Sequence, residues 1–181
     1  MQNVKAQIMD KDAVERALKR IAHEIAEKNN GADDVCIVGI KRRGIPLAEK
    51  LCLNIKEIEG KEVPCGQLDI KFYRDDLSRI SDLPHAQKPE FNFDVNDRTV
   101  ILVDDVMYTG RTVRAAIEGV FSCGRPKKIQ LAVLIDRGHR ELPLRADYVG
   151  KNVPTSRSET IAVKIPPYDD KCCVLLCDVQ P

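Results

Sequence analysis

The chain has 181 residues, a length typical of one domain, and a formal net charge of +1 at pH 7. Hydrophobic residues make up 43% and charged residues 31%, proportions that exclude a disordered tail or a membrane protein. No run approaches the ~20 apolar residues of a membrane span, and residues 1–10 lack the apolar core of a signal peptide. We therefore expect a cytoplasmic protein with no membrane partner.

Seven cysteines are present, an odd number, and most lie in apolar runs such as 172–177. This is typical of buried free thiols in a reducing compartment. No Cys-x2-Cys or His-x3-His spacing is present, so the sequence predicts no zinc site.

The first half of the chain alternates between helix and strand patterns. Asp10 can cap a helix in which Val14, Leu18, Ile21 and Ile25 recur at helical spacing, ending near residues 29–31. A continuous apolar run predicts a buried strand over 35–40, and a second helix follows over about 45–55.

Alternating side chains predict a further strand over 67–73. Residues 74–97 are polar and contain two prolines, so we expect a long loop of the kind that is usually functional or mobile. A buried strand over 99–103, a helix over 113–121 and a strand over 128–135 complete an α/β fold. We expect one domain over 1–181 with a mainly parallel sheet, and a ligand site beyond the carboxyl ends of its strands.

The segment 100–112 carries the clearest chemistry. Apolar residues deliver Asp104 and Asp105 to a strand end, where carboxylates can accept hydrogen bonds from ligand hydroxyls. The turn over 109–112 then opens a helix, and its N–H groups and threonine hydroxyls favour an anion. Together they predict a ribose 5-phosphate site. An acidic strand end with an ordinary helix cap explains each half separately but not both at this spacing.

A second candidate lies at the end of the 35–40 strand. Lys41, Arg42 and Arg43 stand between two glycines and directly precede a helix, where they could bind a pyrophosphate. Taken alone, a run of charges like this is more often a solvated turn.

The segment 100–112 resembles the phosphoribosyl pyrophosphate (PRPP) motif of the type I phosphoribosyltransferases. A response-regulator receiver domain also places acids at strand ends, but its acidic pair lies near the N-terminus and it lacks the 109–112 turn. The resemblance implies a type I phosphoribosyltransferase fold and a diphosphate loop at 41–43, where the family usually has Thr at Arg42. It also implies a flexible loop that starts at Tyr73, Arg74 and Asp75 and closes over the substrate.

The segment 135–156 is similar to the PyrR family of pyrimidine-operon attenuators that are also uracil phosphoribosyltransferases. This resemblance covers nearly the whole chain and weakens over 75–96 and after 166. It implies transfer of phosphoribose from PRPP, which carries Mg²⁺, to uracil, giving UMP and diphosphate. Asp104 and Asp105 would be catalytic. The substrate-binding residues would be Lys41, Arg42, Arg43, Asp104, Asp105, Val106, Met107, Tyr108, Thr109, Gly110, Arg111, Thr112, Arg137 and Ile161.

The family resemblance also implies UMP-responsive binding to pyrimidine-operon leader mRNA. Cations lie on the helix face opposite the apolar stripe, and residues 125–151 carry an excess of four positive charges. The expected RNA-binding residues are Lys19, Arg20, His23, Arg140, Arg145 and Lys151. Without the family, a solvated helix face explains the same pattern. A homodimer or homotetramer is expected, since a second copy would enlarge this patch.

Two alternatives remain beside the bifunctional protein. A plain salvage phosphoribosyltransferase would lack the RNA function, and the 137–151 segment counts against it. An RNA-binding regulator without catalysis is disfavoured by the intact acidic pair and the intact 109–112 turn.

Overall fold

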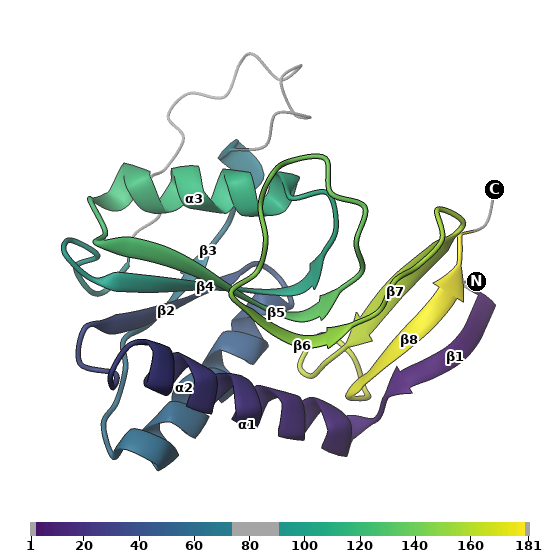
Figure 1. Ribbon diagram of the computed structural model, residues 1–181, viewed down its shortest axis with the longest axis horizontal. Coiled ribbons are helices and arrows are strands. Elements are labelled where there is room, and N and C mark those ends of the chain that lie inside the picture. Colours follow the sequence, from purple (N-terminus) through teal and green to yellow (C-terminus); the bar gives the residue numbers. More distant parts are fainter. Residues whose placement is uncertain (1–2, 74–90, 180–181) are drawn as a thin grey trace.

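The computed structural model describes residues 3–73 and 91–179 and contains two β-sheets (Figure 1). The larger sheet is parallel and has the strand order β3-β2-β4-β5-β6. Its strands are β2 (Val35–Ile40), β3 (Cys65–Leu68), β4 (Thr99–Met107), β5 (Lys128–Asp136) and β6 (Tyr148–Asn152). Within these residues no helix has the length and apolar character needed to cross a membrane.

Helices cover both faces of this sheet. Helices α1 (Lys11–Lys28) and α2 (Gly44–Glu59) lie on one face, and α3 (Arg111–Cys123) lies on the other (Figure 1). Alternate strand residues therefore enter two cores: Ile101 packs with the α1–α2 side, and Leu102 packs with the α3 side. This confirms the predicted α/β fold with a mainly parallel sheet.

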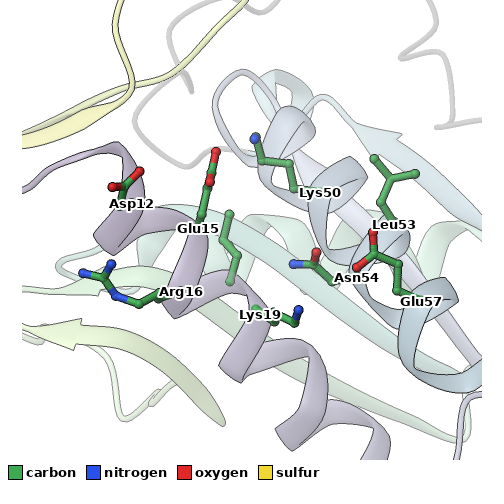
Figure 2. Close-up of a pocket in the computed structure, with 9 residues that line it drawn as sticks. Asp12, Glu15, Arg16, Lys19, Lys50, Leu53, Asn54 and Glu57 are labelled. Carbon is green, nitrogen blue, oxygen red and sulfur yellow. The ribbon is translucent and has the colours of Figure 1, made fainter.

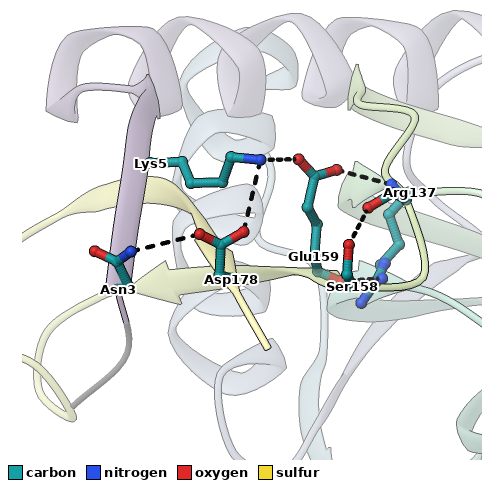
Figure 3. Close-up of polar contacts among 7 residues, drawn as sticks. Asn3, Lys5, Arg137, Ser158, Glu159 and Asp178 are labelled. Carbon is teal, nitrogen blue, oxygen red and sulfur yellow. Dashed lines mark hydrogen bonds and ion pairs between the residues drawn. The ribbon is translucent and has the colours of Figure 1, made fainter. Parts of the chain in front are cut away.

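The smaller sheet is antiparallel and was not predicted. It pairs β1 (Asn3–Met9), β8 (Cys173–Asp178) and β7 (Glu159–Lys164) in that order. Lys5 of β1 donates to the Glu159 carboxylate at 2.7 Å and lies 3.6 Å from that of Asp178 (Figure 3). The first and last strands of the chain are thereby joined to β7, which leads back toward the larger sheet.

The predicted strand over 67–73 is too long. Strand β3 ends at Leu68, and a 3-10 turn occupies Lys71–Tyr73. The cause is local: the Asp69 carboxylate accepts the N–H of Lys71 at 3.1 Å, and the Ile70 carbonyl accepts the N–H of Tyr73 at 2.9 Å. An aspartate that bonds its own backbone two residues on favours a turn over an extended strand.

The expected loop over 74–97 falls largely outside the described residues, and so do Arg74 and Asp75. Its described part, 91–97, is packed rather than loose. Phe91 and Phe93 stack with ring centroids 5.4 Å apart against the α3-side core, and Val95 is buried. The carbonyl of Arg125 accepts the N–H of Asp97, which fixes the chain just before β4.

Candidate functional site

A pocket of about 370 Å³ opens beyond the carboxyl ends of β2, β3 and β4. In this pocket the predicted loop of Lys41, Arg42 and Arg43, here called the cation loop, meets the acidic pair Asp104 and Asp105. The lining residues are Lys41, Arg42, Arg43, Asp69, Ile70, Lys71, Asp104, Asp105, Val106 and Thr112.

Two glycines allow the cation loop to lie this close to β4. A Cβ on Gly39 would lie 2.7 Å from the carbonyl oxygen of Gly44, and a Cβ on Gly44 would overlap the carbonyl oxygen of Val103. Real Cβ atoms do not approach backbone this closely, so larger residues would push the loop away from the acidic pair.

At this junction Asp104 is buried and Asp105 is half-buried. The Asp104 carboxylate accepts the N–H of Asp105 at 2.9 Å, and that of Asp105 accepts the N–H of Val106 at 2.8 Å. Burial raises the pKa of Asp104 well above its usual range, and the charge of Asp105 acts in the same direction. Burial also raises the pKa of Asp105, although hydrogen bonds and the charge of Arg43 oppose it. The charged form of such carboxylates is stabilised by ligand hydroxyls or cations that replace the missing water.

The predicted phosphate turn follows directly. Gly110 caps α3 with φ +96°, a left-handed conformation that favours glycine. Thr112 lines the pocket, and the Thr109 hydroxyl accepts the N–H of Arg111 at 3.3 Å. Arg111 pairs with Glu141 at 2.8 Å, which ties the turn to the segment after β5. The turn therefore presents a helix N-terminus beside the acidic pair, as the sequence predicts.

Two of the loop cations have carboxylate partners that sequence reasoning missed. Lys41 lies 3.2 Å from Asp69, and Arg43 donates to both oxygens of Asp169, at 3.0 and 3.2 Å. Burial alone raises the pKa of Asp169, but hydrogen bonds from Arg43, the Ile165 N–H and Lys164 outweigh it and lower the pKa to about 2. No sequence motif predicts the pairing of Asp169 with Arg43, because 126 residues separate the two.

Four more of the expected substrate-binding residues, which are Met107, Tyr108, Arg137 and Ile161, differ in their exposure. Tyr108 is 40% exposed, and the Arg137 guanidinium lies 4.1 Å from its ring centroid. Arg137 is itself buried and donates to the Glu159 carbonyl and the Thr155 hydroxyl, which holds β7 and the half-buried Ile161 nearby along that strand. Met107, by contrast, has its side chain in the α3-side core, so only its backbone can face a ligand.

The RNA-binding candidates on α1 are exposed but point to different sides. Lys19 lines a groove of about 420 Å³ between α1 and α2, among acidic as well as basic side chains (Figure 2). Arg20 donates to the carbonyls of Val149 and Gly150, at 3.0 and 2.7 Å, and pairs with Glu24. Arg20 therefore joins α1 to β6, and exposed His23 lies one turn further along α1.

The remaining RNA-binding candidates also differ. Arg145 and Lys151 are exposed; Lys151 reaches the Ile8 carbonyl at 3.4 Å, and Arg145 makes no side-chain hydrogen bond or ion pair within the described residues. Arg140 instead donates to the Asp136 carboxylate and to the carbonyls of Leu144, Tyr108 and Gly138. These hydrogen bonds fix the conformation of the segment after β5.

The cysteines are free thiols, and the described part of the chain holds no large group of metal ligands. All seven cysteines are free, three of them buried and four half-buried. Across residues 3–73 and 91–179, no group of three or more His, Cys, Asp or Glu side chains is placed to hold a metal ion.

A protein-family model described as a phosphoribosyl transferase domain matches residues 5–170. The "Bifunctional protein PyrR" of Clostridium acetobutylicum is 61% identical over 93% of this chain and 95% of its own length. That of Acetivibrio thermocellus is 57% identical over 97% of this chain and 96% of its own.

Solved structures show the same fold at much lower identity. A hypoxanthine-guanine phosphoribosyltransferase of Bacillus anthracis has a TM-score of 0.71 at 18% identity, covering 98% of this chain and 99% of its own. The hypoxanthine phosphoribosyltransferase of Trypanosoma cruzi has a TM-score of 0.74 at 16% identity, covering 98% of each chain.

Proposed function

The chain belongs to the PyrR family of phosphoribosyltransferases, and from this premise we propose that its pocket transfers phosphoribose from PRPP to uracil while its surface binds pyrimidine-operon leader RNA in response to UMP. The observation that carries the enzymatic half is a pocket in which cations, the carboxylates of Asp104 and Asp105 and a helix N-terminus meet. These are the groups that a diphosphate, a ribose and a 5-phosphate require.

In this proposal the acidic pair holds the sugar. Asp104 and Asp105 accept hydrogen bonds from the ribose hydroxyls, while the 109–112 turn binds the 5-phosphate through its N–H groups and threonine hydroxyls. A sugar fixed at both ends is aligned for attack at its anomeric carbon, and such alignment can contribute several kcal/mol to catalysis.

The cation loop binds the leaving diphosphate. Lys41, Arg42 and Arg43 stabilise the negative charge that grows on it as the bond to the sugar breaks and the ribose becomes oxocarbenium-like. The Asp169 carboxylate accepts hydrogen bonds from Nε and Nη2 of Arg43. The Nη1 amino group of Arg43 is thereby left for an oxygen of the substrate. Magnesium bound to PRPP would neutralise diphosphate charge, and the carboxylates of Asp104 and Asp105 beside the loop would face that complex.

The base site lies on the other side of the acidic pair. Arg137 braces the Tyr108 ring and fastens β7, so that Tyr108, Val106 and Ile161 border the place where a flat pyrimidine would sit. Arg137 acts here as a positioning residue, because its own hydrogen bonds run to β7 and to Thr155.

The enzymatic proposal is tested by incubating the protein with magnesium, PRPP and one free base at a time. Uracil should give UMP and diphosphate, whereas orotate, hypoxanthine and adenine should give no appreciable nucleotide. Turnover of a purine without turnover of uracil would overturn the assignment.

The RNA half of the proposal rests on the junction of α1 and β6. Arg20 fastens these two elements together, and exposed His23, Arg145 and Lys151 lie on them or in the segment that leads into β6. In a homodimer or homotetramer, two such surfaces would form a longer cationic site in the cytoplasm, where leader mRNA is made.

A plain salvage enzyme is the alternative, and binding separates the two. The wild-type protein should retain a pyrimidine-operon leader hairpin in a filter assay more tightly than a scrambled hairpin. Arg145→Ala should weaken that binding, while Lys171→Ala, an exposed cation on the smaller sheet's connecting loop, should not. Equal retention of both hairpins would reduce the protein to a salvage enzyme.

A further inference from the structure

Two cysteines share a pocket outside the substrate site. Cys52 of α2 and Cys65, the first residue of β3, are both half-buried and border a cavity of about 310 Å³. The other lining residues are Glu49, Leu53, Lys56, Glu62 and Val63. Solvent thus reaches two neighbouring thiols that the transfer reaction does not use.

The two sulfurs are not equivalent. The neighbouring Cys65 sulfur and burial raise the pKa of Cys52 far above its usual range. The neighbouring Cys52 thiol lowers the pKa of Cys65, against the opposing effects of burial and of the Glu49 charge. Of the two thiols, Cys52 therefore holds its proton more strongly. Thiolates are the nucleophiles of cysteine chemistry, so Cys65 is the more reactive sulfur.

The charges around the cavity select the reagent. The carboxylates of Glu49 and Glu62 disfavour the entry of an anionic reagent, and Lys56 is paired with Glu62 at 2.6 Å. Leu53 and Val63 supply an apolar wall. A small uncharged molecule is therefore admitted more readily than an anionic one.

We propose that Cys52 and Cys65 form a thiol-modification site that reacts with small neutral disulfides and closes into an intramolecular disulfide. The Cys65 thiolate attacks one sulfur of the reagent RSSR, forming a mixed disulfide and releasing RS⁻. That thiolate takes the proton of Cys52, and the Cys52 sulfur then attacks the Cys65 sulfur and releases the second RS⁻, which is protonated by solvent. The protein is oxidised by two electrons and RSSR is reduced to two RSH. The new bond would fasten α2 to β3.

The probe is 2-hydroxyethyl disulfide, added to the folded full-length protein, followed by quenching of free thiols and peptide mapping by mass spectrometry. The wild-type protein should yield a peptide cross-linked between Cys52 and Cys65. Cys52→Ser should stop at a stable hydroxyethylthio adduct on Cys65, and Cys65→Ser should leave Cys52 largely unmodified. Cys172→Ser, which removes a half-buried thiol elsewhere, should leave the cross-link unchanged.

Three results would overturn the proposal. They are a wild-type adduct on Cys65 that never resolves, a cross-link between other cysteines, and reaction of Cys52 in the Cys65→Ser variant as fast as in the wild type. Far-ultraviolet circular dichroism of each variant shows that the comparison is made on folded protein.

Discussion

Replacing Asp169 by Asn tests whether the smaller sheet helps to position the diphosphate loop. The pKa of Asp169 lies at about 2 in the folded chain, against 3.8 for an unperturbed aspartate. At ~1.4 kcal/mol per pKa unit, this difference amounts to about 2 kcal/mol of stability at neutral pH. Arg43 is 33% exposed, so solvent screens the pair, and we expect the variant to lose about 1–2 kcal/mol.

The pH dependence has a definite sign. Because folding lowers this carboxyl's pKa, its contribution to the free energy of unfolding is fully present above about pH 4 and is lost as the pH falls toward 2. Urea unfolding of wild type and Asp169→Asn should therefore differ at pH 7 and converge toward pH 2. Asp170→Asn is the matched control, since exposed Asp170 makes no side-chain hydrogen bond or ion pair among the described residues.

The same variant should affect transfer. Without its carboxylate partner, Arg43 must be ordered when PRPP binds, so the KM for PRPP should rise by roughly fivefold to tenfold, since ~1.4 kcal/mol corresponds to a factor of ten. The KM for uracil should change little. An unchanged KM for PRPP, in a variant whose stability has fallen as predicted, would show that Arg43 is positioned without Asp169.

Three further changes probe the rest of the account. The double variant Asp104→Asn/Asp105→Asn should lose on the order of 10²-fold or more in transfer rate, yet thermal unfolding should find it no less stable, because burial disfavours both charges. Gly44→Ala should cost about 1–3 kcal/mol in denaturant unfolding and also lower activity, because its methyl group meets the Val103 carbonyl; full activity would contradict the close packing described. Lys151→Ala should reduce the log–log salt slope of RNA binding by about one if it contacts one phosphate, with uracil transfer unchanged.

The central sheet and its pocket could be predicted because their signals are local. A buried apolar run identifies β4, and Asp104, Asp105 and the 109–112 turn follow within a few residues of it. Parallel strands bring their carboxyl ends to one edge of the sheet, so motifs that follow different strands converge in space. The cation loop at 41–43 joined them for the same reason.

The smaller sheet could not be predicted, because its pairing is non-local. Strand β1 has an exposed, weakly apolar pattern and finds its partner β8 at the opposite end of the chain. The role of Asp169 could not be predicted for the same reason, since only the folded chain brings it to Arg43. The four internal acceptors of the Arg140 guanidinium could not be predicted either, and whether Arg140 also contacts RNA stays a prediction.

The most direct test of one protein with two coupled roles is a titration of the leader hairpin with and without UMP. The segment that begins at Arg137, beside Tyr108, runs on to Arg145 and Lys151, so a bound nucleotide and a bound RNA would share one piece of structure. We predict that UMP tightens RNA binding and, by linkage, that the hairpin tightens UMP binding by the same factor. Hairpin affinity that UMP does not change, or that a scrambled hairpin matches, would contradict the account.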